Sequence, residues 1–301
     1  MPRQLEPAWA SFVRLELQIP AHSRIEKILC SSTVEDVKLT NEKDALTPPL
    51  KWAGGKRWLI PHLAPIWQEH SSRRLAEPFC GGLAVTLGLT PKKALLNDIN
   101  PHLLNFYRHL KSGLTVDIQT ENDSELFYQH REKFNELIKT EQHETPEAAQ
   151  LFYFLNRTCF NGLCRFNKSG FYNVPFGRYK TINYREDFLE FPPLFANWTF
   201  QCGDFELLKT KTTDFIYADP PYDVEFTQYS AGGFNWEDQV RLAHWLKKHP
   251  GPVALSNQLT PRIEELYTDL GFTLTTLDAP RRISCTGDRT PAKEVLATLN
   301  L

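Results

Sequence analysis

An aspartate, two prolines and a tyrosine stand in a row directly after a short apolar run. The run spans 215–218, and the motif is Asp219-Pro220-Pro221-Tyr222. Two prolines fix the backbone and remove two N–H donors, so the turn offers mainly carbonyl acceptors. The Asp219 carboxylate and the Pro220 carbonyl can accept both N–H bonds of an exocyclic amine on a flat base, while Tyr222 stacks on the ring. An amine held in this way directs its lone pair at an electrophilic methyl group. A rigid turn at a strand end is the alternative interpretation.

Two glycine-containing segments precede this motif. The first is Lys51-Trp52-Ala53-Gly54-Gly55-Lys56, where paired glycines before a predicted helix let backbone amides approach an anionic or carboxylate group. The second is Glu77-Pro78-Phe79-Cys80-Gly81-Gly82, followed 16 residues after its last glycine by Asp98. An acid at that place can accept hydrogen bonds from both ribose hydroxyls, but the glycine pattern of a pyrophosphate site is missing. A nucleoside that carries an amino acid, such as S-adenosylmethionine, fits better. Purely structural turns remain the alternative for both segments.

The elements that must hold these residues alternate between strand and helix. Strands are predicted at 75–77, 94–96, 215–218, 253–256, 272–277 and 295–299, of which 215–218 is entirely apolar. Helical spacing predicts helices at 56–70, 82–89, 101–111, 236–249 and 261–270, with Pro61 as an irregularity in the first. Alternation of this kind predicts an α/β fold with a doubly wound, mostly parallel sheet. The carboxyl ends of its strands then open onto the ligand crevice.

Three stretches differ in composition and define the expected domains. Residues 1–46 look like an extension of unknown role, with a short strand pattern at 13–19 and a linker-like Thr47-Pro48-Pro49 after it. Residues 112–187 interrupt the alternation, because they are aromatic, helix-prone and then turn-rich. We therefore expect an inserted domain at 112–187 and a catalytic domain at 47–111 and 188–301.

Composition narrows the class of protein. The 301 residues are 41% hydrophobic and 23% charged, which fits a globular enzyme and not a disordered chain. No apolar run is long enough to cross a membrane, and the first residues do not resemble a secretory signal. The six cysteines form no C-x-x-C pair, so we expect reduced thiols, a cytoplasmic location and no metal.

A net charge of −2 conceals two oppositely charged stretches. Residues 117–150 carry nine acidic and three basic side chains, whereas 156–185 carry six basic and no acidic ones. Such a separation usually marks surfaces with different partners, although two unrelated solvated faces are the alternative.

Taken together, these motifs resemble the Dam-type (D12 class, group alpha) family of site-specific DNA adenine-N6 methyltransferases. The order Lys-Trp-Ala-Gly-Gly-Lys, cofactor motif, recognition domain and Asp-Pro-Pro-Tyr is that of the family. Residues 155–167 and 171–179 resemble its recognition stretch, and the similarity spans roughly 47–301. The resemblance implies a Rossmann-like S-adenosylmethionine-dependent sheet with an inserted, mainly helical target-recognition domain.

The same resemblance assigns roles at the cofactor pocket. It implies that four residues contact S-adenosylmethionine, namely Trp52, Lys56, Asp98 and Asp219. It further implies that Phe79 and Gly81 line the pocket and that Asp204-Phe205 meets the cofactor's adenine. This chain departs from the family in its Cys80-Gly81-Gly82 order and in an aspartate, Asp288, within the basic loop 281–289.

A further set of residues is expected to contact double-stranded DNA. Within the basic stretch, Arg165 can pair bidentately with a guanine edge, and Leu163 and Pro175 can meet thymine methyl groups. Phe160 is the candidate to fill the space that an extruded base leaves, whereas Phe166, Phe171 and Phe176 are expected in the core of the small domain. The expected DNA-binding set is Lys51, Phe160, Asn161, Leu163, Arg165, Asn173, Pro175, Arg178 and Tyr179.

The expected activity is methyl transfer from S-adenosylmethionine to N6 of adenine in duplex DNA, within GATC. The target adenine would be flipped out of the helix, with Asp219, Pro220 and Tyr222 as the catalytic residues. A cytosine-N4 or RNA methyltransferase is the nearest alternative enzyme, and a non-catalytic DNA-binding regulator is the alternative of another class. The sequence does not distinguish a solitary enzyme from a restriction-modification partner.

Overall fold

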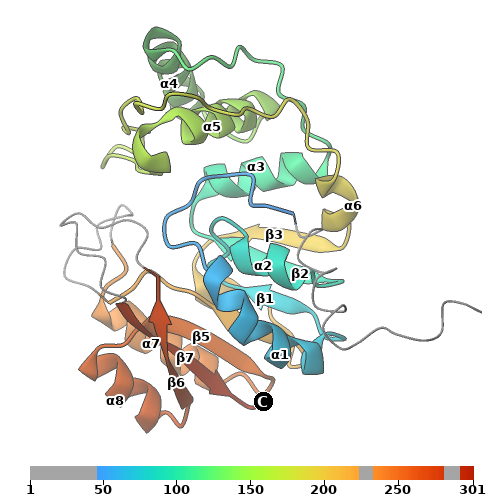
Figure 1. Cartoon of the computed structure of the whole chain (residues 1–301), viewed down its shortest axis with the longest axis vertical. Coiled ribbons are helices and arrows are strands. Elements are labelled where there is room, and N and C mark those ends of the chain that lie inside the picture. The colour runs from blue at the N-terminus through green and yellow to red at the C-terminus, as the bar shows by residue number, and fades with distance from the viewer. Residues whose placement is uncertain (1–45, 224–232, 281–291) are drawn as a thin grey trace, which may run out of the picture. The chain divides into compact units, whose positions relative to one another are not determined.

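The computed structural model describes residues 46–223, 233–280 and 292–301. A seven-stranded sheet is their central element, and Figure 1 shows helices packed around it. Its strands are β1 (Leu75–Glu77), β2 (Ala94–Asp98), β3 (Trp198–Cys202), β4 (Phe215–Ala218), β5 (Val253–Gln258), β6 (Thr273–Ala279) and β7 (Ala292–Leu299). The strand order is β3-β2-β1-β4-β5-β7-β6, with β7 antiparallel to both of its neighbours. Residues Ala45–Leu301 form one compact unit.

Helices cover both faces of the sheet, as the alternation of strand and helix predicts. On one face lie α1 (Ile60–His70), α2 (Ala84–Leu89) and α3 (Pro101–Lys111), and on the other lie α7 (Trp236–Lys247) and α8 (Pro261–Asp269). Alternate residues of β4 serve the two layers: Phe215 and Tyr217 pack with α1 and α2, and Ile216 and Ala218 pack with α7 and α8. The doubly wound α/β fold is therefore confirmed.

Two elements differ from the sequence-based expectation. β3 lies at the edge of the sheet and pairs only with β2, so its residues lack the continuous burial that marks the central strands. The first predicted helix begins with a 3-10 turn at Arg57–Leu59, followed by α1. Pro61 lies in the first turn of α1, where a missing N–H removes no intrahelical hydrogen bond.

The stretch 112–187 contains two longer helices and a bridged loop. These are α4 (Ser124–Lys139), which Asp123 caps, and α5 (Pro146–Thr158), which Thr145 caps. Antiparallel bridges Cys159–Phe176 and Phe166–Tyr172 then fold residues 159–176 into a hairpin-like loop. The short elements η2 (Phe160–Gly162), α6 (Phe191–Phe195) and η3 (Phe205–Leu207) complete the described secondary structure.

A single buried core joins this stretch to the sheet through α3, which lies between them (Figure 1). Phe106 of α3 stacks on Tyr153 of α5, with ring centroids 5.9 Å apart. Of the three phenylalanines expected in the core, Phe166 and Phe176 pack against it while remaining half-buried, and Phe171 lines a surface pocket.

Some expectations fall outside the described residues. These are the strand pattern at 13–19 and the basic loop 281–289 with Asp288. Within the ranges that the structure describes, no helix combines the length and apolarity needed to cross a bilayer.

Candidate active site and DNA-reading surface

The motifs predicted from the sequence meet at one edge of the sheet. The glycine turn follows β1, Asp98 ends β2, Asp204 follows β3, and Asp219 follows β4, so all four lie at carboxyl ends of parallel strands. The chain moves outward from β1 through β2 to β3 and from β4 to β5. The crevice for a ligand therefore lies between β1 and β4, where the strand order reverses.

Asp219 lies between a hydroxyl and an ammonium group. Ser256 of β5 donates a hydrogen bond to its Oδ1 at 2.9 Å, and Lys56 Nζ lies 3.4 Å from the same oxygen. Burial raises the pKa of Asp219, and the Lys56 charge and the Ser256 hydrogen bond partly oppose that shift.

Lys56 is itself buried, with 5% of its surface exposed. Its ammonium donates to the Gly54 carbonyl at 2.9 Å and lies 4.4 Å from the centre of the Tyr222 ring. The second carboxylate near it belongs to Glu294, whose Oε2 is 4.0 Å away and accepts the Tyr222 hydroxyl. One buried cation therefore serves two carboxylates and the face of one aromatic ring.

Glu294 is not among the residues predicted from the sequence. It lies on β7, opposite Gln258 of β5, and directly precedes the apolar run that was predicted as a strand from 295. Burial raises the pKa of Glu294, and the positive charge of Lys56 opposes this rise. In the sequence, the only sign of its role is a charged residue at the start of a strand that belongs to the core. The pairing register of β7 with β5 is what brings Glu294 to Lys56.

Buried polar groups hold the rest of the Asp-Pro-Pro-Tyr turn. Gln239 of α7 donates to the Pro221 carbonyl at 2.8 Å, and Asn257 donates to Gln239 at 2.9 Å and to the Tyr267 hydroxyl at 3.0 Å. These three supporting side chains are at most 1% exposed. Because a buried amide without partners is costly, this network fixes the backbone of the turn.

The turn after β1 is built on close backbone approach. The Gly81 amide donates to Asp98 Oδ2 at 3.0 Å, and the Tyr107 hydroxyl donates to the Gly81 carbonyl at 2.7 Å. Gly81 has a φ of +42°, and a Cβ at either Gly81 or Gly82 would lie 2.7 Å from an atom of the Trp52 side chain. Glycine is therefore required here, and Trp52 packs directly on the turn.

Asp98 accepts two backbone amides, from Gly81 at Oδ2 and from Asn100 at Oδ1. Burial raises its pKa, and the amide hydrogen bonds oppose that change. Each oxygen retains a further lone pair for a ligand hydroxyl.

Asp204 and Phe205 have protein partners of their own. Arg241 makes a bidentate pair with Asp204 at 2.8 and 2.9 Å and lowers its pKa. Phe205 is only 2% exposed and packs beneath Phe79, with ring centroids 5.6 Å apart. Phe79 is the half-buried ring of this pair, so it offers more surface to a ligand than Phe205 does.

A further carboxyl group, that of Glu77, is buried at the end of β1. Glu77 ends β1, is 2% exposed and accepts the Thr86 hydroxyl at 2.5 Å. Burial raises its pKa to about 8, while the Thr86 hydrogen bond opposes the shift. Glu77 therefore carries a proton at neutral pH.

Stability measurements can test this protonation. In the unfolded chain Glu77 ionises near its usual pKa of 4.5, whereas in the folded protein it keeps its proton up to about pH 8. The free energy of unfolding therefore loses a contribution as pH rises from about 4.5 to 8. Glu77→Gln lacks this loss, so its stability relative to the unsubstituted protein should rise across that interval in urea titrations. The exposed Glu69→Gln is the control, and parallel pH curves for Glu77→Gln and the unsubstituted protein would contradict the assignment.

Apart from Lys51, the expected DNA-contacting residues lie in the loop that follows α5, between residues 160 and 179. Phe160 is 47% exposed, and Asn161, Arg165, Pro175 and Arg178 are exposed. Leu163, Asn173 and Tyr179 are half-buried. Lys51 turns toward the protein: its ammonium donates to the Arg157 carbonyl at 2.8 Å and lies 3.5 Å from the Tyr179 ring centre, and burial lowers its pKa.

Arg165 is oriented by its neighbour across the loop. Its Nε donates to Asn173 Oδ1 at 2.8 Å, and its Nη2 donates to the Asn173 carbonyl at 3.3 Å. One edge of the guanidinium is therefore held by protein, and the edge formed by Nη1 and Nη2 remains for a planar acceptor pair.

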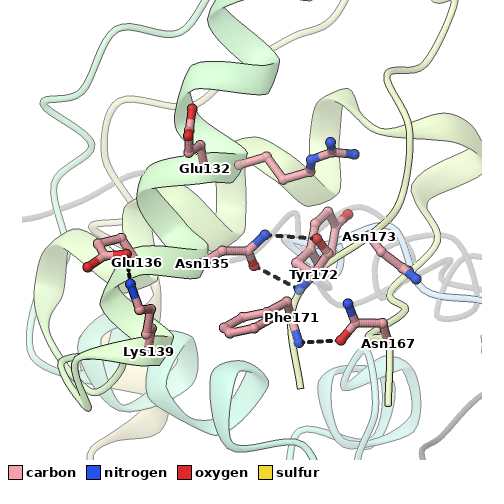
Figure 2. A pocket seen from close by; sticks show the side chains of 9 residues that line it. Glu132, Asn135, Glu136, Lys139, Asn167, Phe171, Tyr172 and Asn173 are labelled. Atoms are coloured by element: carbon pink, nitrogen blue, oxygen red, sulfur yellow. Dashed lines mark hydrogen bonds and ion pairs between the residues drawn. The ribbon is translucent and has the colours of Figure 1, made fainter. Parts of the chain in front are cut away.

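A side-chain amide of α4 holds this loop in place. Asn135 accepts the Tyr172 amide at 2.8 Å and donates to the Tyr172 carbonyl at 3.1 Å, as Figure 2 shows. This pairing reproduces the hydrogen bonds of a neighbouring strand. The open pocket of about 530 Å³ in Figure 2 lies between α4 and residues 167–173.

Within the described ranges, no group of three or more potential ligand side chains could hold a metal ion.

Comparison with known proteins identifies the family. A family model described as D12 class N6 adenine-specific DNA methyltransferase matches residues 52–283. The Type II methyltransferase M1.LlaDCHI of Lactococcus lactis is 36% identical over 263 residues, which cover 81% of this chain and 91% of that protein. A DNA adenine methylase of Vibrio cholerae is 35% identical over 271 residues, which cover 82% of this chain and 94% of that protein. A precorrin-6y C5,15-methyltransferase structure from Geobacter metallireducens aligns with 8% identity and a TM-score of 0.35, covering 89% of this chain and 96% of that one.

A DNA N-6-adenine-methyltransferase of Escherichia phage P1 extends the similarity. It is 36% identical over 299 residues, which cover 92% of this chain, although the chain spans only 39% of that relative. Since 92% exceeds the share of residues 46–301, the alignment also includes part of the first 45 residues. The family model and these relatives agree: the chain belongs to the D12 class of N6 adenine-specific DNA methyltransferases.

Proposed function

We propose that this enzyme transfers a methyl group from S-adenosylmethionine to N6 of adenine in double-stranded DNA, within GATC, after flipping the adenine out of the helix. The observation that carries the proposal is the Asp219 turn at the point where strand order reverses. There, Asp219 meets Ser256 and the buried Lys56, and Tyr222 is tied to Glu294. Acceptors and an aromatic ring are thus preorganised beside a cationic group.

The charged groups around the crevice suit S-adenosylmethionine. Lys56 matches a carboxylate, Asp219 matches a cationic ammonium or sulfonium group, and Asp98 retains lone pairs for two ribose hydroxyls. Trp52, packed on Gly81 and Gly82, supplies an aromatic wall. The cofactor, when bound, supplies the electrophilic methyl group.

The chain's own contribution to catalysis is to hold the adenine amine. Asp219 and the Pro220 carbonyl accept its two N–H groups, so the nitrogen lone pair is less delocalised into the ring. Tyr222 stacks on the base, and its hydroxyl bond to Glu294 restricts the ring to one orientation. Rate acceleration then comes mainly from positioning and electrostatics, since these groups do not have to reorganise during the reaction.

The target base is proposed to leave the helix because an amine that is paired inside a duplex cannot reach this crevice. Unpairing and unstacking the base costs about a few kcal/mol. Phe160, 47% exposed at the start of the DNA-reading loop, is the proposed side chain to fill the gap. The exposed cations of this stretch other than Arg165, which are Lys168, Arg178 and Lys180, are the proposed phosphate contacts.

Arg165→Ala should relax sequence discrimination at one guanine of the site. A bidentate guanine contact contributes roughly 1–3 kcal/mol, so the preference for that base should fall about 5- to 150-fold. Transfer rates on duplexes with single substitutions in GATC measure this effect. Asn173 orients Arg165, and its backbone carbonyl remains in Asn173→Ala, so this substitution should reduce the same preference less. Equal loss at every position of the site would contradict a specific contact.

Single-molecule sequencing of DNA from cells that express the protein tests the whole proposal. We expect N6-methyladenine in GATC and nowhere else. Methylated cytosine, or adenine methylation in a different motif, would contradict the base or the site specificity. Absence of any modification, with retained binding to GATC duplexes, would favour a non-catalytic regulator.

A further inference from the structure

Asn156, like Asn135, pairs through its side-chain amide with both backbone groups of another residue, and we call such a pairing an amide clamp. The Asn156 clamp connects the proposed DNA-reading region, which is the end of α5 and the loop 159–176, to the cofactor side of the molecule. We propose that Asn156 is a positioning residue that couples DNA reading to cofactor binding through the adjacent residues Lys51 and Trp52. The inference rests on the proposed function, because it assigns the cofactor to the crevice and DNA to the loop after α5.

Asn156 lies near the end of α5 and is 1% exposed. Its Oδ1 accepts the Lys51 amide at 2.8 Å, and its Nδ2 donates to the Lys51 carbonyl at 2.8 Å. Both backbone groups of Lys51 are thus paired with one buried side chain that is 105 residues away in sequence. Because these hydrogen bonds are part-buried and Asn156 itself is buried, loss of the Asn156 amide would remove both protein partners of the Lys51 backbone.

The Lys51 side chain adds further contacts to the same region. Its ammonium binds the Arg157 carbonyl and covers the Tyr179 ring, which is in the proposed DNA-contacting set. A Cβ at Gly162 would lie 2.4 Å from Lys51 Cβ, so the loop that begins at Phe160 packs tightly on Lys51. A shift of this loop therefore displaces Lys51.

The next residue contacts the cofactor side. Trp52 packs on Gly81 and Gly82, whose amides and carbonyls shape the turn around Asp98. Four residues further, Lys56 reaches Asp219. Lys51 and Trp52 are covalently adjacent, yet one is fixed to the DNA-reading region and the other to the cofactor turn. The two sites therefore share a short, doubly anchored segment.

Such a connection predicts positive, reciprocal coupling. DNA that orders the loop after α5 also fixes Lys51, and with it the Trp52 wall, so the cofactor subsequently binds to a pocket that is already ordered. By linkage, the cofactor must tighten DNA binding by the same factor. Asn156 is the member of this connection that contacts neither ligand.

The test measures S-adenosylhomocysteine affinity by calorimetry, with and without a saturating duplex that contains one GATC site. For the unsubstituted full-length protein, we expect the duplex to tighten binding at least about fivefold. In Asn156→Leu this ratio should fall toward one, while affinity without DNA changes less. Gly162→Ala, which pushes against Lys51 from the loop, should lower the ratio independently. Circular dichroism verifies that each variant is folded.

The matched control is Asn135→Leu, which removes the other amide clamp, between α4 and Tyr172. It should weaken discrimination between DNA sequences and lower the coupling ratio less than Asn156→Leu does, because it loosens the loop at Tyr172 without freeing the backbone of Lys51. The coupling is overturned if the duplex does not change the S-adenosylhomocysteine affinity of the unsubstituted protein. It is also overturned if folded Asn156→Leu keeps the full affinity ratio, or if Asn135→Leu lowers that ratio as much as Asn156→Leu does. Methyl transfer by the unsubstituted protein on the same duplex is measured in parallel. Absence of methyl transfer would count against the proposed function. If transfer is intact but Asn156→Leu has the same affinity ratio as the unsubstituted protein, only the coupling is overturned.

Discussion

Asp219→Asn should reduce methyl transfer at least about 100-fold, as expected when one preorganised electrostatic group is removed from an active site. The substitution keeps the size of the side chain but replaces a carboxylate oxygen by an N–H donor. Toward Lys56 or the incoming amine that N–H would meet another donor, and the Ser256 hydroxyl could accept it only by giving up its own hydrogen bond to this side chain. The amine would then lose the acceptor that concentrates its lone pair.

Incorporation of tritium from labelled S-adenosylmethionine into a GATC duplex measures this loss. Asp269→Asn, at the exposed end of α8, is the control and should retain full activity. A circular dichroism melt verifies that the Asp219 variant is folded. Transfer within a few fold of the unsubstituted rate would refute the role of Asp219.

The same carboxylate predicts an acid limb in the pH dependence of transfer. Burial raises the Asp219 pKa above its usual 3.8, so protonation removes the acceptor at a higher pH than an exposed aspartate would require. Transfer should therefore fall as pH is lowered through that raised pKa, as measured by single-turnover rates with saturating DNA.

Lys56→Met should have the second largest effect, on both stability and cofactor affinity. The ammonium is the buried counter-charge of Asp219 and Glu294, at 3.4 and 4.0 Å. Removing it leaves two largely buried carboxylates together, at a cost of about 3 kcal/mol in the free energy of unfolding. Loss of a charge-assisted hydrogen bond to the ligand should also weaken S-adenosylhomocysteine about 10- to 100-fold.

Urea titration and calorimetry separate these two consequences. The added substitution Glu294→Gln should recover part of the lost stability, because one unpaired carboxylate disappears, but it should not restore cofactor affinity. The loss in Lys56→Met should also shrink at low pH, where the carboxyl groups take up protons. Lys92→Met, an exposed lysine, is the control. A double variant no more stable than Lys56→Met would contradict the shared counter-charge.

Local features made much of the fold predictable from sequence. The central strand β4 is a short apolar run followed by turn residues, and α3 begins at Asn100-Pro101, a capping residue followed by proline. The edge strand β3 lacked this signal, because a strand that pairs on one side only does not need continuous apolar residues. Pro61 was misjudged since its effect depends on its position within the first turn of the helix.

Sequence by itself determined the family, the doubly wound α/β class and the order of the motifs, because residue type and spacing along the chain carry this information. Tertiary structure alone decided which groups share a charge or a hydrogen bond. Glu294 reaches Lys56 through the antiparallel register of β7, and Asn156 pairs with Lys51 across 105 residues. Contacts of this range depend on how sheet edges and helix ends meet in space, and no local pattern encodes that meeting.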